Sequence, residues 1–408
     1  MGNEIELSSV ITDIAAGPFG SNLKVECFVP YGFPIIDGAN LKGYKVTDNL
    51  TKFVTEEKAR SLSRSIARRG DVVVTISGTL GQIAYIPEDS IFEEYLCSQR
   101  QFRVSFDTSQ VYVPYLVFYF HTFEGQNKIL SFANQTGVPA LSQPLKNFKK
   151  IRLCLPDYRT QKKIASIIEA FNDKIECNQK INENLLQQLD ALYQELSTRD
   201  TWDITPIGDL AEKIAMGPFG SNIKVSTFVP YGVPIISGNH LRGYFLEEPS
   251  YNYITEEHAE KLKNSVVYPG DVVFTHAGNI GQVAMIPNGC DYPRYVLSQR
   301  QFYLRCNTEK LIPEYVTLFF HSKEGQHELL SYANQTGVPS IAQPASNLKK
   351  ISLPVPPLQI QEDWADLVRP IIAQYQQNKL EIRALSTMRD TLLPKLMSGK
   401  IDVSNIQL

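Results

Sequence analysis

The side chains best suited to specific recognition gather in short segments rich in glycine and amides. Gly17–Asn22 is a Gly-Pro-Phe-Gly turn followed by Ser and Asn, and Gly78–Gln82 holds two glycines. Ser98–Gln101 places amides on both sides of a guanidinium, and Asn134–Gly137 adds a further amide pair. Asn and Gln can bind adenine through two hydrogen bonds, and Arg can bind guanine in the same way. Turns and buried amide networks have similar sequences, so each segment alone is a weak indication.

These segments occur twice, at a constant offset of 200 residues. Gly217–Asn222, Ser298–Gln301 and Asn334–Gly337 repeat three of them exactly, and Gly278–Gln282 repeats the fourth with changes. An ungapped alignment of 17–155 with 217–355 gives 66 identities in 139 positions. Coincidence does not produce such agreement, so the chain holds two copies of one globular module.

Polar side chains in and beside these segments are therefore candidate contacts to nucleic acid. In the first copy they are Ser21, Asn22, Lys24, Asn40, Lys42, Ser77, Thr79, Gln99, Arg100, Asn134 and Gln135. In the second copy they are Ser221, Asn222, Lys224, His240, Arg242, His276, Asn279, Gln299, Arg300, Asn334 and Gln335.

Positions that differ between the copies could change the bases that are read. Ile76-Ser77 becomes His276-Ala277, Thr79 becomes Asn279, Ala39-Asn40 becomes Asn239-His240, and Arg103 becomes Tyr303.

Sequence signatures of catalysis are missing. There is no phosphate-binding P-loop, no dinucleotide-binding glycine motif, no Asn-Pro-Pro-aromatic motif and no His-Glu-x-x-His. The repeated His121 and His321 follow aromatic-rich segments, and we expect them to pack or cap. Glu56-Glu57 and their repeat fit the first turn of a helix capped by Thr55 and Thr255. We therefore assign no catalytic residue, no metal ligand and no cofactor to this chain.

The composition is that of a globular protein without a strong charge. The chain has 408 residues, of which 43% are hydrophobic and 20% charged, and its net charge is −3. Two or three domains are expected, and disordered, collagen-like and disulfide-dense classes are excluded. Because the charge is near neutral, phosphate neutralisation on DNA would have to be local or come from partner proteins.

The cysteines and the apolar runs point to the cytoplasm. No two of the six cysteines have Cys-x-x-Cys spacing, and none is repeated in the other copy, so we expect neither a zinc site nor a structural disulfide. No apolar run approaches 18 residues and the N-terminus lacks a secretory signal, so we expect a reduced, cytoplasmic protein without a membrane span.

Each module is followed by a long segment with apolar residues spaced alternately four and three apart. This heptad spacing predicts two helices that pack together as a coiled coil. A pseudo-twofold relation between the two copies would make the pair antiparallel, with Asn178 and Asn378 meeting near its centre. The alternative is that each helix packs only on its own module. Pro394 and Gly399 are expected to break the second helix. The seam residues are Ile164, Ile168, Phe171, Ile175, Asn178, Leu185, Leu189, Trp364, Val368, Ile371, Tyr375, Asn378, Ile382 and Leu385.

We therefore predict an α+β fold, with two tandem α/β modules separated and followed by long helices that form an antiparallel coiled coil. The modules span 1–155 and 201–355, and the helical segments span 156–200 and 356–408. Within the first module, 70–75, 82–87 and 101–104 are typical of strands, while 115–122 and 124–133 are typical of helices.

This arrangement resembles the specificity subunit of type I restriction–modification enzymes. Phe171–Glu183 looks like that family's central helical region, and Arg389–Val403, with its Leu-Leu-Pro-Lys-Leu-Met-Ser-Gly core, matches its usual C-terminal ending. The Gly-Pro-Phe-Gly-Ser-Asn start is similar to one group of its target-recognition domains. The resemblance covers essentially the whole chain.

The resemblance implies a non-catalytic subunit that reads a bipartite site in double-stranded DNA. Each module would be a target-recognition domain for one half-site, and the helices would be a spacer. The subunit would bind two modification subunits, which methylate adenine N6 with S-adenosylmethionine, and restriction subunits that use ATP and magnesium. The similarity of the two modules favours related half-sites.

Two alternatives remain open at this stage. The chain could be a duplicated scaffold that recruits two identical protein partners without DNA, or a nuclease with unrecognised catalytic residues. Binding that ignores both salt and sequence would favour the scaffold, and cleavage by the isolated chain would favour the nuclease.

Overall fold

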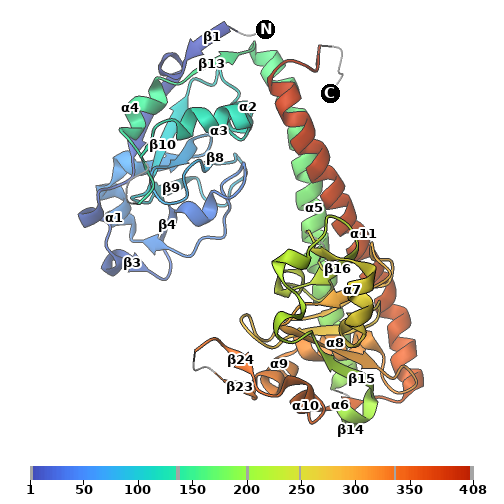
Figure 1. The fold of residues 1–408 in the computed structure, drawn as a ribbon. Coiled ribbons are helices and arrows are strands. Elements are labelled where there is room, and N and C mark those ends of the chain that lie inside the picture. Colours follow the sequence, from blue (N-terminus) through green and yellow to red (C-terminus); the bar gives the residue numbers. More distant parts are fainter. Residues whose placement is uncertain (1–2, 135–137, 199–201, 248–249, 335–336, 405–408) are drawn as a thin grey trace. The chain divides into compact units, whose positions relative to one another are not determined.

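The computed structural model describes residues 3–134, 138–198, 202–247, 250–334 and 337–404. They form two compact units, each built from one module and from parts of both long helices (Figure 1). Unit 1 joins Met1–Asn178 with Leu380–Leu408, and unit 2 is Gln179–Lys379.

The module of unit 1 contains two main sheets. An antiparallel four-stranded sheet has the order β2-β10-β7-β8, and a mixed five-stranded sheet has the order β3-β5-β4-β9-β6. The strands are β1 (Asn3–Glu6), β2 (Ile11–Ala16), β3 (Phe28–Val29), β4 (Phe33–Ile36), β5 (Phe53–Val54), β6 (Ile66–Arg68), β7 (Val72–Thr75), β8 (Ile83–Tyr85), β9 (Glu94–Cys97), β10 (Gln101–Phe106), β11 (Ala133–Asn134), β12 (Ala140–Leu141) and β13 (Arg152–Leu155). The helices are α1 (Glu56–Ser61), α2 (Val113–Phe120), α3 (Phe123–Leu130) and α4 (Pro144–Lys149).

The four-stranded sheet is buried on both faces, which explains why its strands are continuous apolar runs. Alternate side chains of a strand point to opposite faces. Val72 and Val74 join the core beneath α2 and α3, whereas Val73 packs with Ile36 and Cys97 against the five-stranded sheet. The strands expected at 70–75, 82–87 and 101–104 are confirmed as β7, β8 and β10.

Capping residues set the bounds of the short helices. Thr55 accepts a hydrogen bond from the N–H of Lys58, and Thr255 accepts one from His258, as the sequence predicted. Thr122 lies between α2 and α3 and caps α3 through the N–H of Gly125, so the helices expected at 115–122 and 124–133 are observed with slightly earlier bounds.

The module of unit 2 repeats this fold. Its sheets have the orders β15-β22-β19-β20 and β17-β16-β21-β18. The strands are β14 (Asp203–Pro206), β15 (Ala211–Met216), β16 (Val233–Ile236), β17 (Tyr253–Ile254), β18 (Val266–Val267), β19 (Val272–Thr275), β20 (Val283–Met285), β21 (Tyr295–Leu297), β22 (Gln301–Cys306), β23 (Ala333–Asn334), β24 (Ser340–Ile341) and β25 (Ser352–Val355). The helices are α6 (Ile207–Leu210), α7 (Glu256–Lys261), α8 (Pro313–His321), α9 (Lys323–Leu330) and α10 (Pro344–Leu348).

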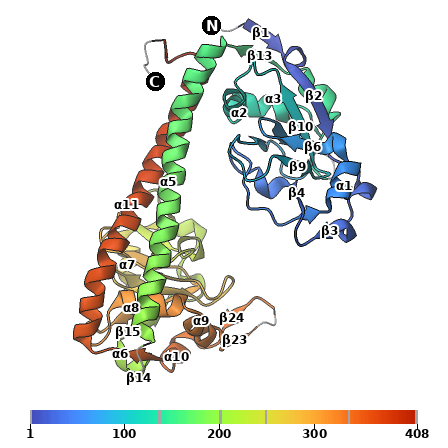
Figure 2. The ribbon, with the colours of Figure 1, turned by 180° about the vertical axis from the view of Figure 1, so that it is seen from behind.

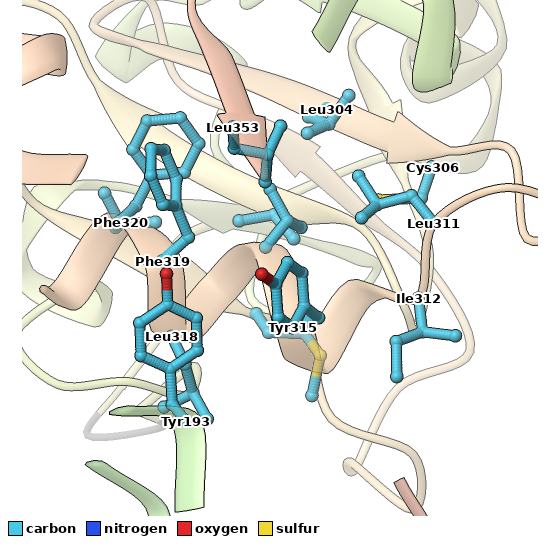
Figure 3. Close-up of a cluster of buried hydrophobic side chains, with 14 of the residues drawn as sticks. Tyr193, Leu304, Cys306, Leu311, Ile312, Tyr315, Leu318, Phe319, Phe320 and Leu353 are labelled. Carbon is cyan, nitrogen blue, oxygen red and sulfur yellow. The ribbon is translucent and has the colours of Figure 1, made fainter. Parts of the chain in front are cut away.

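The core of unit 2 extends from the module to the long helices. Figure 3 shows Tyr315, Phe319 and Phe320 of α8 packed among Leu304, Leu353 and Tyr193. Tyr193 belongs to a long helix, so one continuous apolar core holds the module on the helical segment.

The two long helices are α5 (Tyr158–Ser197) and α11 (Leu358–Met397), which lie side by side in both views (Figures 1 and 2). Their pairing is antiparallel within each unit. In unit 1, Arg389 donates to Asn172, and Lys163 donates to the carbonyl of Val403. In unit 2, Trp364 donates to the carbonyl of Leu192. The predicted coiled coil is therefore confirmed.

All the predicted seam residues are buried or half-buried. The helices also pack on the modules, because the fully buried Gln161 receives the N–H of Tyr112 and donates to the carbonyl of Gln110. Gln361 does the same with Ile312 and Lys310. The alternative, in which each helix packs only on its own module, therefore accounts for the helix–module contacts but not for the contacts between the two helices.

Two expectations about the helices are wrong in detail. Asn378 donates to Asn182 at 2.8 Å, and Asn178 donates to Glu381, so the asparagine pair forms one turn away from the predicted partners. Pro394 lies inside α11. Proline removes one helical hydrogen bond, but the buried Leu393 and Leu396 hold the last turn in place. The helix ends at Met397, before Gly399 with its positive φ of 70°.

Candidate nucleic-acid interface

Strand register brings the predicted polar segments to one end of each module. β10 begins at Gln101, which pairs with Thr75 at the end of β7, while Phe102 pairs with Ala16 at the end of β2. The segments that follow β2 and β7 and the one that precedes β10 therefore leave the sheet at the same edge. The segment after β4 joins them, because β4 and β9 are parallel and end together at Ile36 and Cys97.

The second module has the same register. Gln301 pairs with Thr275, and Phe302 pairs with Met216. The segments rich in Gly and amides at 17–23, 76–82 and 98–100, and their repeats, are thus neighbours in space. The amide segment at Asn134 also approaches, because β11 pairs with β12 and Ala140 of β12 pairs with Ser77.

Glutamine side chains brace these segments from within. Gln99 donates to the carbonyls of Gly20 and Leu23, at 3.1 and 2.6 Å, and Gln299 donates to Gly220 and Ile223. The amide nitrogen expected to read a base is therefore occupied in both modules. The segments approach so closely that a β-carbon at Gly17 would lie 1.9 Å from the carbonyl oxygen of Ser98, which only glycine allows.

A second set of amides lies beneath the surface. Buried Gln101 accepts from the hydroxyl of Ser98. Gln82 accepts from the hydroxyl of Thr75 at 3.0 Å and donates to the carbonyl of Gly38 at 3.0 Å. Equivalent bonds join Ser298 with Gln301 and Thr275 with Gln282. Satisfied buried networks of this kind fix one arrangement of the segments.

The arginines of the Ser-Gln-Arg-Gln segments are the exposed donors. Arg100 and Arg300 are exposed, and neither guanidinium has a hydrogen-bond or ion-pair partner among the residues that the structure describes. Each lies beside a glycine with positive φ: a β-carbon at Gly78 would be 3.7 Å from Nη1 of Arg100, and one at Gly278 would be 3.3 Å from Nη1 of Arg300. Two donor groups of matching position are thus presented by the two modules.

The braced segments surround a hollow of about 730 Å³ in module 1, which we call the loop hollow. Arg100, Ser77 and Thr79 line it on one side. Asp37 and Lys52, which the sequence did not single out, line it as well and form an ion pair of 2.6 Å. Burial alone would raise the pKa of Asp37, but hydrogen bonds from Lys52 and the N–H of Ala39 outweigh it and lower the pKa.

Two predicted contacts belong to the scaffold instead. Asn40 is buried, accepts from the N–H of Asp37, and donates to the carbonyls of Thr47 and Asn49. His240 is buried in the same place, accepts from the N–H of Ser237, and donates to the carbonyl of Ser250. Because their polar atoms are used inside the chain, neither side chain is available to a ligand.

Arg103 and Tyr303 also belong to the scaffold. Arg103 is buried and reaches Asp13 at 2.6 Å and the carbonyl of Arg64 at 3.1 Å, and Tyr303 is fully buried. The difference between the copies at this position therefore concerns packing and not the ligand.

Most of the other candidate residues are exposed, two are half-buried, and three lie outside the described residues in whole or in part. Ser77 and His276 are half-buried, and Nε2 of His276 lies 3.1 Å from the carbonyl of Gln299. Burial lowers the pKa of His276. Gln135, Gln335 and the side chain of Ser221 lie outside the described residues. The exposed candidates are Ser21, Asn22, Lys24, Lys42, Thr79, Asn134, Asn222, Lys224, Arg242, Asn279 and Asn334.

Exposed aromatic residues at these loops were not chosen from the sequence. Phe19 is 83% exposed and Phe219 is 72% exposed, each within the segment that Gln99 or Gln299 braces. Tyr31 and Tyr231 are similarly exposed, but they precede β4 and β16 and so lie at the other ends of those strands. The signal was available, because an aromatic residue kept between glycines in both copies without a core to fill is unusual.

His121 and His321 have the structural role that the sequence predicted. Nε2 of His121 lies 2.8 Å from the carbonyl of Ile83, and Nε2 of His321 lies 2.8 Å from that of Val283. Within the described ranges, no group of three or more histidine, cysteine, aspartate or glutamate side chains could hold a metal ion. None of the described helices has both the length and the apolar character needed to cross a membrane.

Comparisons with known proteins agree with this architecture. The model of the type I restriction modification DNA specificity domain matches residues 28–187 and 199–384. The MjaIX specificity subunit of a type I restriction enzyme from Methanocaldococcus jannaschii is 21% identical over 384 residues, covering 86% of this chain and 82% of that protein. The MjaVIII specificity subunit from the same organism is 23% identical and covers 66% of each chain.

A solved structure has the same fold. The crystal structure of the S subunit of a type I restriction–modification system from M. genitalium gives a TM-score of 0.62 at 14% identity, and the match covers 97% of this chain and 96% of that one.

Proposed function

Since this chain belongs to the type I restriction–modification DNA specificity family, we propose that its two modules each read one half of a bipartite DNA site. Each module would do so through its loop end, the end at which the segments 17–23, 76–82 and 98–100, or their repeats in module 2, lie together. The chain is a specificity subunit with two target-recognition domains and no catalytic activity of its own. The observation that carries the proposal is the convergence of the duplicated polar loops, in each module, on an exposed arginine that has no partner among the described residues.

The chemistry of this end suits a duplex groove. Arg100 and Arg300 are free to make the paired hydrogen bonds to guanine, and Thr79 and Asn279 are exposed beside them. Braced loops add to this, because a contact group that is already ordered loses less entropy on binding. Lys24, Lys42, Lys224 and Arg242 supply positive charge near the same loops for the phosphates.

The helices α5 and α11 would set the spacing of the half-sites. α5 runs without a break over 40 residues, or roughly 60 Å at 1.5 Å per residue. An insertion of one heptad in both helices is expected to change the number of unread base pairs without changing the half-sites. An insertion that changes the half-sites would contradict the spacer role.

The reaction itself would come from partners. Two modification subunits would methylate adenine N6 with S-adenosylmethionine, after flipping the base out of the duplex. Restriction subunits would add ATP- and magnesium-dependent translocation and cleavage. The near-neutral charge of the chain fits an assembly in which those partners hold much of the DNA backbone. We expect this assembly to act in the prokaryotic cytoplasm, where its DNA substrate lies.

The decisive experiment maps methylated adenines in a genome with and without the gene for this chain. We expect one bipartite motif to lose its methylation when the gene is removed. R100A and R300A should each relax one half of that motif, while R152A, which removes an exposed arginine of β13, should leave it intact. Methylation that persists without the chain, or a motif that neither variant alters, would contradict the proposal.

A further inference from the structure

A second hollow lies in unit 1 between the module and α5, on residues to which no role in DNA reading is assigned. Its volume is about 460 Å³, and we call it the α5 hollow. Its walls come from the loop after β8, from the start of α2 and from the face of α5 that carries Tyr158 and Glu169. All of these belong to one unit, so the hollow is a feature of that unit alone.

The α5 hollow contains acidic groups and a hydroxyl without a partner. Tyr85 is only 7% exposed, lines the hollow, and has no hydrogen-bond partner for its hydroxyl among the described residues. Because Tyr85 lines the hollow, its hydroxyl oxygen can accept a hydrogen bond from a ligand there. Glu169 is half-buried, and the one hydrogen-bond donor to its carboxylate among the described residues is the hydroxyl of Tyr112, at 3.4 Å from both oxygens.

The cations nearby do not neutralise Glu169. Lys45 lines the hollow, but its ammonium group pairs with Asp173 at 3.2 Å. Lys162 lies over the rings of Tyr112 and Tyr158, 5.7 and 5.0 Å from their centroids. Glu88 and Asp89 add exposed carboxylates to the wall. Burial raises the pKa of Glu169, although the hydroxyl of Tyr112 and the charge of Lys45 act in the opposite direction, as expected for a carboxylate whose charge is offset only in part.

Unit 2 differs from unit 1 in the charges at the equivalent positions. The positions of Pro114 and Glu169 are occupied there by Glu314 and Arg369. The guanidinium of Arg369 donates to Glu314 at 3.0 Å and to Glu362 at 3.0 Å. Unit 2 thus places its own guanidinium where unit 1 has a carboxylate beside a hollow.

We propose that the α5 hollow binds a guanidinium or alkylammonium group, with Glu169 as the counter-ion, the Tyr85 hydroxyl oxygen as a further acceptor, and the rings of Tyr112 and Tyr158 as an aromatic wall. A charged N–H group would satisfy the carboxylate through charge-assisted hydrogen bonds, and aromatic faces attract cations. The group could belong to a small free cation or to a side chain of a partner subunit, since both present the same chemistry.

The test uses the full chain and agmatine, which carries a guanidinium at one end and an amine at the other. Calorimetric titration should show one site with a Kd below about 10 mM, the weak range expected for a single charged contact. E169Q, which keeps the shape and removes the charge, should weaken binding about tenfold or more. E57Q, at an exposed glutamate of α1, should leave the Kd within about twofold.

Two further variants separate binding from folding. E169R supplies an internal guanidinium, as Arg369 does in unit 2, and should abolish agmatine binding. Y85F should weaken binding while far-ultraviolet circular dichroism stays that of the parent chain. Absence of agmatine binding below about 10 mM, or binding that E169Q leaves unchanged, would overturn the proposal.

Whether the bound cationic group comes from a partner side chain or from a free cation can be tested in the complex with the modification subunits. If a partner side chain fills the hollow, agmatine binding should disappear on assembly, and if the hollow serves a free cation, binding should persist. Both results require binding to the isolated chain. None of these measurements involves DNA, so the assignment of the α5 hollow and the proposed reading of half-sites succeed or fail separately.

Discussion

The loop ends of the two modules are held by the same hydrogen bonds, but some of the residues that line them differ. Gln99 and Gln299 bind the same backbone carbonyls, and the hydroxyl–amide pairs beneath them are repeated. In the walls, the Asp37–Lys52 ion pair of module 1 has no counterpart in sequence, because those positions are Ser237 and Asn252 in module 2. The residues that hold the loops and the exposed arginines are therefore the same in both modules, while other residues that line the loop hollow differ.

The comparison also sorts the positions at which the copies differ. Ser77 and Thr79 line the loop hollow, and their counterparts Ala277 and Asn279 have the matching place in module 2. Asn40 and His240, by contrast, make equivalent internal hydrogen bonds. We therefore expect a polar difference between the duplicated modules to alter recognition only where the side chain reaches the surface.

The largest test exchanges whole modules. A chain in which residues 217–355 also replace 17–155 should recognise a site whose two halves match. Mismatched base pairs cost about 1–3 kcal/mol each and add up over a half-site, so the original site should be lost. Methylome sequencing reads the outcome directly. The reciprocal exchange is the control and should give the other matched site, whereas an unchanged motif would contradict modular reading.

Single arginines give the next largest effect. R100A should reduce discrimination at a base pair of one half-site by about 1–3 kcal/mol, and R300A should do so in the other half-site. Competition binding with substituted oligonucleotides, in the presence of the modification subunits, measures the change. Equal weakening toward all sequences would instead identify these side chains as phosphate contacts.

Acid sensitivity tests the equivalent histidines. Burial lowers the pKa of His321 to about 4, from the ordinary histidine value of 6.5. The folded chain keeps this imidazole neutral, while the unfolded chain binds a proton below pH 6.5. Its contribution to stability is therefore complete above pH 6.5 and is lost as the pH falls toward 4.

At pH 5 the loss from His321 should be about 2 kcal/mol, since one pH unit corresponds to about 1.4 kcal/mol. H321Q, whose amide can still donate to the carbonyl of Val283, should remove that part of the pH dependence. Urea unfolding at pH 7.5 and pH 5 measures it. H327Q, at an exposed position of α9, is the matched control. Equal pH dependence of H321Q and the parent chain would refute the assignment.

Long-range order was easier to predict than local roles. Heptad spacing identified α5 and α11, because an apolar stripe over 40 residues has few other uses. Their antiparallel direction followed from the pseudo-twofold relation expected between the two copies. The pairing of Asn378 with Asn182 could not be predicted, since adjacent turns of α5 both offer asparagine at the seam. The strand β1 was also missed, because its four residues form a strand only by pairing with β13.

At the interface, the sequence identified the right segments but not which side chains are free. Gln99 and Arg100 are neighbours in one exposed segment, yet one braces Gly20 and Leu23 and the other is unpaired. That difference depends on where the 17–23 segment folds back, which is a contact over some 80 residues of chain. Asp37 and Lys52 were missed for the same reason, because neither lies in a repeated motif.

The smallest expected effect is at position 40. N40H places in module 1 the residue that module 2 uses for the same internal bonds, an acceptor toward the N–H of residue 37 and a donor toward the following loop. The free energy of unfolding should change by less than about 1 kcal/mol, and the half-site should not change. N40A, which leaves those buried groups unpaired, should cost about 1–3 kcal/mol. If N40H altered the methylated motif while N40A merely destabilised the chain, position 40 would read DNA after all, and burial would be a poor guide to which duplicated differences matter.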